Sequence, residues 1–148
     1  MKIAALAFYK GPPSSKDWVH VLSHWVTCIW TWCWWSHGEL VLNGRCHSSS
    51  ARDNGVRVKD IDLTTGRWDI LHITLTNEEF DAAEAWFEAH RGRKYDFRNV
   101  VRFVLPWFGH SSKRFVCFEA IGAALGLAAP HKLTAKDLYE WALTRTPK

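Results

Sequence analysis

The fold is decided by residues 36–50, which read SHGELVLNGRCHSSS. The first half of this stretch has a period of two, which places His37 and Glu39 on one face of a strand and Leu40 on the other. Asn43-Gly44 is a strong hairpin signal, because both residue types accept the positive φ of a tight turn. The stretch therefore predicts two antiparallel strands.

The length of this turn decides which side chain of the second strand shares a face with His37. A two-residue loop puts Cys46 on that face, whereas a three-residue loop that ends at Arg45 puts His47 there. Glu39 shares the face with His37 in either case. Both His47 and Glu39 are therefore candidates to orient the His37 ring.

Further strands and helices surround the hairpin. Strands are expected at Lys2–Tyr9, Val56–Leu63 and Trp68–Leu75. Helices are expected at 15–29, 76–90 and 97–105, from Ser111 or Ser112 through Leu125, and from Thr134 through Leu143. The helix at 76–90 opens with a capping box of Thr76 and Glu79. This pattern predicts an α+β domain in which an antiparallel sheet packs against helices.

Size and composition indicate one folded domain over residues 1–148. The chain is 47% hydrophobic and 14% aromatic along its whole length, which excludes disorder. Its longest apolar stretch, Trp25–Trp35, is shorter than the ~20 residues that cross a bilayer, so no membrane insertion is expected. The apolar run Ile3–Phe8 is too short for a secretion signal, which predicts a cytoplasmic protein.

The charge balance is only mildly basic. The chain has 19 basic and 15 acidic residues and a net charge of +4. The densest basic stretch, residues 90–98, is interpreted as a solvated helix end and loop. We therefore expect no nucleic-acid partner, and the sequence does not indicate an oligomeric state.

The four cysteines form no C-x-x-C pair, and because a cytosolic chain seldom keeps disulfides, we interpret all of them as thiols. They are Cys28, Cys33, Cys46 and Cys117. The first three lie near His37 and His47, but these spacings match no familiar zinc finger or ribbon. We expect neither a zinc site nor another cofactor.

Cys117 is the candidate nucleophile. It follows Lys113-Arg114 and is expected about a turn inside the helix that Ser111 or Ser112 opens. Helix N-termini and nearby cations lower the pKa of a cysteine and favour the thiolate. A thiolate also needs an imidazole to stabilise it and to protonate the leaving group, and His37 is held at a strand end where it can do both. The alternative is a small buried thiol in the core.

Six short motifs, in this order, carry a resemblance. They are Ser36-His37-Gly38-Glu39-Leu40-Val41, Ser48-Ser49-Ser50, Gly55-Val56-Arg57, Trp68-Asp69, Tyr95-Asp96 and Phe115-Val116-Cys117-Phe118-Glu119. The chain resembles phage-encoded members of the circularly permuted NlpC-type family of papain-like cysteine peptidases and acyltransferases, from Ala7 to Tyr139. In that family the histidine precedes the cysteine, as His37 precedes Cys117 here.

The resemblance implies a papain-like fold and a thiol hydrolase or acyltransferase that cleaves an amide or ester through a covalent acyl-enzyme. The substrate classes that it implies are peptidoglycan peptides and lipid-like acyl groups. It favours His47 over Glu39 as the third catalytic residue, and we therefore expect the three-residue turn that contains Arg45. It also implies that Tyr95 lies near the nucleophile and helps the Cys117 backbone N–H to hold an oxyanion.

Two departures from the family pattern support a different function. Phe118 stands where such sequences usually have serine, and Asn99-Val100 replaces an expected glycine. Both are what a decayed site would show. The alternative is therefore a catalytically inactive binding or structural module of a phage particle, with a virion-associated rather than a cytoplasmic location.

Overall fold

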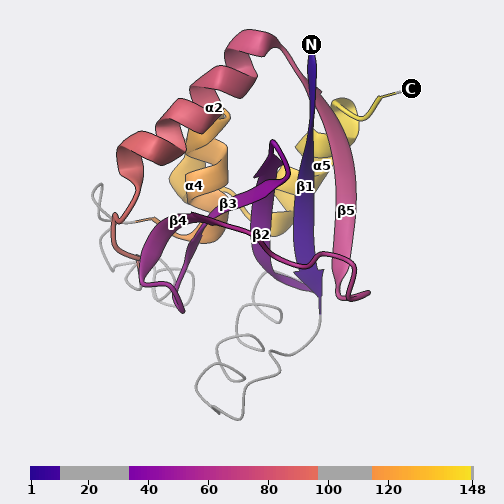
Figure 1. Ribbon diagram of the computed structural model, residues 1–148. Coiled ribbons are helices and arrows are strands. Elements are labelled where there is room, and N and C mark those ends of the chain that lie inside the picture. Colours follow the sequence, from indigo (N-terminus) through magenta and orange to yellow (C-terminus); the bar gives the residue numbers. More distant parts are fainter. Residues whose placement is uncertain (11–33, 97–114, 148) are drawn as a thin grey trace.

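A five-stranded antiparallel sheet forms the centre of the part of the chain that the computed structural model describes, residues 1–10, 34–96 and 115–147. The strands are β1 (Lys2–Lys10), β2 (Trp35–Leu42), β3 (Arg45–Ser50), β4 (Gly55–Lys59) and β5 (Trp68–Leu75). Their order across the sheet is β4-β3-β2-β1-β5 (Figure 1). The α+β class and the antiparallel sheet are as predicted.

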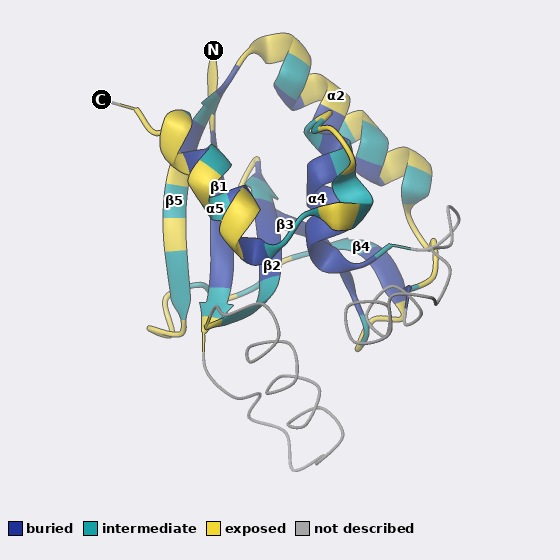
Figure 2. Cartoon of the chain, turned by 180° about the vertical axis from the view of Figure 1, so that it is seen from behind, coloured by how far each residue is buried: buried dark blue, intermediate teal, exposed yellow. Residues whose placement is uncertain are grey.

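Three α-helices within the described residues pack on this sheet: α2 (Asn77–His90), α4 (Cys117–Ala124) and α5 (Ala135–Thr144), with a short 3-10 turn at Pro130–Lys132. The helix α4 lies against β2 and β3, and α5 lies against β5 and β2. Nearly all residues of α4 are buried, whereas α5 combines buried and exposed residues (Figure 2). In this part of the chain, no helix combines the length and the apolar character needed to span a bilayer.

The core lies between the sheet and these helices. Its fully buried side chains come from every layer and include Leu6, Phe8, Leu40, Ile73, Phe80, Phe87, Ile121 and Leu138. Leu6, Phe8 and Leu40 point to the helices because neighbouring residues of a strand point to opposite faces. Burial of each such side chain stabilises the fold by about 1.5–3 kcal/mol.

The predicted helix cap at residue 76 is confirmed. The Thr76 hydroxyl accepts a hydrogen bond from the Glu79 N–H at 3.1 Å, and the Glu79 carboxylate accepts one from the Thr76 N–H at 2.8 Å. The strand at Trp68–Leu75 is confirmed as well, whereas β4 ends at Lys59 rather than at Leu63. The helices expected at 15–29 and 97–105 lie outside the described residues.

The start of α4 differs from the prediction. Val116 is extended, with φ −88° and ψ 167°, and Cys117 is the first helical residue. Residues 111 and 112, the expected start, lie outside the described residues. Cys117 is therefore at the helix N-terminus itself, where the first backbone N–H groups have no partner within the helix.

The hairpin turn contains two residues. Asn43 and Gly44 have φ values of 50° and 75°, as a type I′ turn requires, and Leu42 pairs with Arg45. The expected three-residue turn is wrong, because the local preference of Asn-Gly for a tight turn sets the register. His47 consequently pairs with Leu40 on the helix-covered face.

Backbone hydrogen bonds also reach both outer strands of the sheet. The Val56 N–H of β4 donates to the Arg93 carbonyl at 2.8 Å, and the Gly92 N–H donates to the Val56 carbonyl at 3.0 Å. On β5, the Thr74 N–H donates to the Arg145 carbonyl at 2.9 Å. The segment after α2 and the end of α5 thus lie along opposite edges.

Candidate active site

A close contact between Gly38 and Phe118 brings the N-terminus of α4 to the start of β2. A Cβ atom on Gly38 would lie only 2.6 Å from Cε1 of Phe118, so the glycine makes room for the ring. In the sequence, His37 precedes Gly38 and Cys117 precedes Phe118, so the same contact brings His37 and Cys117 near each other. Phe118 therefore has a packing role of its own.

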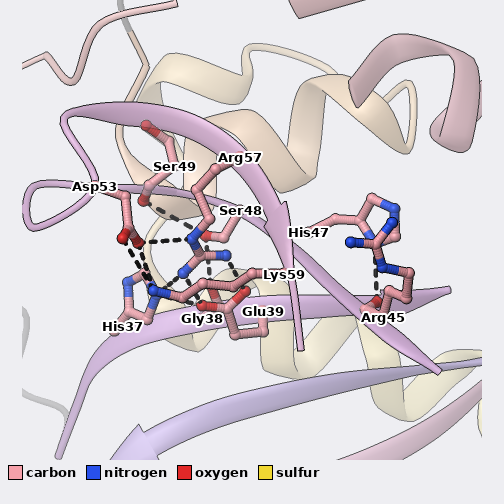
Figure 3. A network of polar contacts seen from close by, with 10 residues as sticks. All are labelled: His37, Gly38, Glu39, Arg45, His47, Ser48, Ser49, Asp53, Arg57 and Lys59. Atoms are coloured by element: carbon pink, nitrogen blue, oxygen red, sulfur yellow. Dashed lines mark hydrogen bonds and ion pairs between the residues drawn. The ribbon is translucent and has the colours of Figure 1, made fainter. Parts of the chain in front are cut away.

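His37 and Glu39 form a hydrogen-bonded pair on the other face of β2. His37 Nε2 lies 2.6 Å from Glu39 Oε1, and the Glu39 side chain is fully buried. Arg57 of β4 donates two hydrogen bonds to the same carboxylate: Nη1 donates to Oε2 at 2.6 Å and Nη2 donates to Oε1. The small Ser48 pairs with Arg57 on the intervening strand, which lets the guanidinium reach across β3 (Figure 3).

The charges continue beyond Arg57. Its Nε donates to Asp53 Oδ2 at 2.9 Å, and Lys59 Nζ lies 2.8 Å from the same oxygen. Positive and negative groups therefore alternate from His37 through Glu39, Arg57 and Asp53 to Lys59. We call these five residues the charge chain.

The charge chain keeps His37 protonated. Burial of the ring lowers the pKa of His37, but the charge of Glu39 and hydrogen bonds with Cys117 and Glu39 outweigh burial and raise that pKa from 6.5 to about 10. Because Nε2 is bonded to Glu39, Nδ1 is the ring nitrogen left for Cys117. The structure thus brings the predicted nucleophile, Cys117, next to the predicted base, His37.

Glu39 itself stays ionised. Burial alone would raise the pKa of the Glu39 carboxyl, yet the hydrogen bonds from Arg57 and the charge of His37 lower it. A buried carboxylate is stable only when it is paired in this way. Glu39 is therefore the residue that can orient and charge the His37 ring.

Tyr95 lies near Cys117. Burial raises the pKa of Tyr95, and the nearby Cys117 and Asp96 charges raise it further, so the phenol stays protonated and can donate a hydrogen bond. The Asp96 N–H donates to the Phe115 carbonyl at 3.2 Å, and the Ser49 hydroxyl donates to that carbonyl at 2.6 Å. These bonds hold the Tyr95 segment beside the start of α4.

His47 is not part of this site. Its Nδ1 lies 2.9 Å from the Arg45 carbonyl, and its ring packs on Phe87 with centroids 5.2 Å apart. Figure 3 shows His47 and Arg45 apart from the charge chain. Burial lowers the pKa of His47 despite its hydrogen bonds. The residue favoured by the resemblance is thus a core histidine that faces the helices.

Arg57 and Asp53 were not predicted as site residues. Arg57 belongs to one of the motifs that carry the resemblance, and the period of two in β4 could have placed it on the His37 face. Sequence spacing could not show that its side chain reaches across a serine to Glu39.

The described residues include no metal-binding group of three or more histidine, cysteine or acidic side chains. Cys28 and Cys33 lie outside them. Cys46 is a buried thiol whose pKa is raised to about 11 by burial and by the Glu39 charge. It is therefore a structural thiol and a natural reference for Cys117.

Comparison with known proteins identifies no family for this chain. A scan against models of protein families finds none that matches the chain, and a search of curated proteins finds no match either. The function is therefore proposed from the arrangement of Cys117, His37 and Glu39.

Proposed function

We propose that the protein is a cysteine-dependent hydrolase or acyltransferase with a papain-like fold of the permuted NlpC type. One observation carries the proposal: Cys117, at the N-terminus of α4, lies next to His37, and Glu39 is hydrogen-bonded to the same ring through Nε2. A helix N-terminus and an adjacent cation both favour the thiolate. The proposed nucleophile, base and orienting residue are Cys117, His37 and Glu39.

The first half of the reaction forms a thioester. The Cys117 thiolate attacks the carbonyl carbon of an amide or ester, and the carbonyl electron pair moves to oxygen. The backbone N–H of Cys117 and the Tyr95 hydroxyl are the proposed donors to this oxyanion. When the intermediate collapses, the bond to the leaving group breaks, and the leaving group takes the Nδ1 proton of His37.

The second half restores the enzyme. Neutral His37 takes a proton from an acceptor, which attacks the thioester carbonyl and expels the Cys117 thiolate. Water as the acceptor gives hydrolysis, and an alcohol or amine gives acyl transfer. The proton remains on His37, so the ion pair with the thiolate is formed again.

The charge chain supports a thiolate at this place. It contains three cations and two carboxylates, so the Cys117 thiolate would balance its remaining positive charge. The resemblance supports a peptide or lipid-like acyl substrate. A cytoplasmic location remains part of the proposal.

Selective alkylation tests the proposal. Iodoacetamide at mildly acidic pH should modify Cys117 much faster than Cys46, because only a cysteine held as a thiolate reacts there. Peptide mapping by mass spectrometry locates the label. Cys117→Ala should remove the fast phase, and His37→Gln should slow it. Ester and amide substrates can then be screened against wild type and Cys117→Ala.

Slow and equal labelling of Cys117 and Cys46 would contradict the proposal. That outcome would favour the non-catalytic binding module. The Cys46 label serves as the internal reference, because its raised pKa keeps that thiol protonated at the test pH.

A further inference from the structure

Arg57 forms two hydrogen bonds to one buried carboxylate, that of Glu39. Both Glu39 oxygens accept hydrogen bonds from its guanidinium, Glu39 is fully buried, and only 13% of the Arg57 side chain is exposed. Two parallel bonds fix the plane of a carboxylate as well as its position, which a single ammonium cannot do. Arg57 therefore stops Glu39 from rotating.

The fixed oxygen is the one that holds His37. Glu39 Oε1 accepts from Arg57 Nη2 and also lies 2.6 Å from His37 Nε2. Arg57 is itself held, because Asp53 accepts from its Nε. The position of the His37 ring is thus connected through one oxygen atom to the orientation of the guanidinium.

We propose that Arg57 is a positioning residue of the candidate active site, which acts through Glu39 to hold the His37 ring against Cys117. The inference rests on the proposed function for its effect on reactivity. Its structural part, the effect of Arg57 on the Glu39–His37 hydrogen bond, is measurable without any reaction at Cys117.

The first experiment observes the His37 ring by NMR in protein with ¹⁵N-labelled histidine. A proton held in a short bond between an imidazolium and a carboxylate resonates far downfield, and His37→Gln assigns the signal. Arg57→Met should move this Nε2–H resonance upfield or broaden it by exchange with water. Arg57→Lys, which keeps the charge and one bond, should give an intermediate spectrum.

Arg145 provides a matched control. Its guanidinium donates two hydrogen bonds to the Glu79 carboxylate, at 3.1 and 3.0 Å. In the sequence, both residues lie far from the charge chain. Arg145→Met therefore removes a pair of the same two-bond geometry without touching Glu39, at side chains that are more exposed, 37% and 34%. It should leave the His37 resonance in place. An unchanged His37 resonance in folded Arg57→Met would overturn the inference.

The second experiment is a double-mutant cycle on the rate of Cys117 alkylation. Arg57→Met alone should slow labelling on the order of tenfold, within the range of coupling found inside one hydrogen-bond network. In a Glu39→Gln background it should cause no further loss, because Arg57 acts through Glu39. If Arg57→Met slowed alkylation by the same factor in both backgrounds, Arg57 would have only a general structural role, and the inference would be wrong.

The cycle also covers the case in which Arg57→Met does not fold. The double variant Arg57→Met with Glu39→Gln buries no unpaired charge, and Arg57→Lys keeps the cation, so both allow comparison with Glu39→Gln alone. If Cys117 is unreactive in wild type, the proposed function fails while the NMR experiment still decides the role of Arg57. If Cys117 is reactive and Arg57→Met leaves the His37 resonance unchanged, only this inference fails.

Discussion

Two histidines on one hairpin, His37 of β2 and His47 of β3, have side chains on opposite faces of the sheet and pKa values displaced in opposite directions. Burial lowers the pKa of both rings. The difference comes from their partners, because His37 meets the Glu39 carboxylate, whereas His47 meets a carbonyl and the ring of Phe87. A charged neighbour can thus outweigh burial, and a neutral one does not.

The largest expected effect is the loss of stability at alkaline pH. Because the folded pKa of His37 is raised, its stabilisation is fully present below pH 6.5 and is lost as the pH rises toward about 10. Urea unfolding at several pH values should show this fall in wild type. The fall should be smaller in His37→Gln and unchanged in His47→Gln. Equal slopes in wild type and His37→Gln would contradict the assignment.

Removal of the Glu39 charge should make the two histidines more alike. Glu39→Gln should lower the pKa of His37 by about 1–3 units, the usual effect of one opposite charge at close range. NMR titration of the ring signals measures it, and the His47 signal is the internal control because His47 lies on the other face. A His37 pKa that stays near 10 would show that another group supports it.

Gly38→Ala should separate Cys117 from His37 while the Glu39 pair stays. The new Cβ would meet the Phe118 ring at 2.6 Å, so the ring, and with it the start of α4, is expected to shift away from β2. Overpacking of this kind destabilises by about 1–3 kcal/mol, which urea unfolding measures. Cys117 alkylation should slow, and adding Phe118→Leu should restore part of the rate. Full reactivity of Gly38→Ala would mean that this contact does not position the thiol.

The smallest effect is expected at His47. His47→Gln removes a buried ring but keeps a donor for the Arg45 carbonyl, so it should destabilise by about 1 kcal/mol at neutral pH. Since the folded pKa of His47 is lowered, wild type should lose stability as the pH falls below 6.5, and the variant should lose less. The rate of Cys117 alkylation should be unchanged. A large decrease of this rate in a folded His47→Gln protein would show that His47 does contribute to the active site.

Local signals in the sequence predicted most of the fold. The capping residues Thr76 and Glu79 and the turn Asn43-Gly44 act within a few residues, so their patterns could be recognised directly. The start of α4 escaped prediction, because Val116 has no polar side chain to cap the helix.

The site was predicted less completely. His37 and Cys117 were recognised by residue type and order, but the choice of His47 followed the resemblance against the local turn preference. One residue of turn length moves every later side chain to the other face. The role of Arg57 depends on contacts across three strands, which no spacing along the chain can display.

The hydrogen bonds along the two outer strands bear on how the protein behaves at high concentration. An outer strand with open backbone groups can recruit the same strand of another molecule and start aggregation. Here Val56 on β4 already bonds with Gly92 and Arg93, and Thr74 on β5 bonds with Arg145. Gly55 permits the first contact, since a Cβ there would lie 1.9 Å from the Arg93 carbonyl oxygen. This glycine therefore lets the chain at Gly92 and Arg93 occupy backbone groups of β4 that another molecule would otherwise pair with.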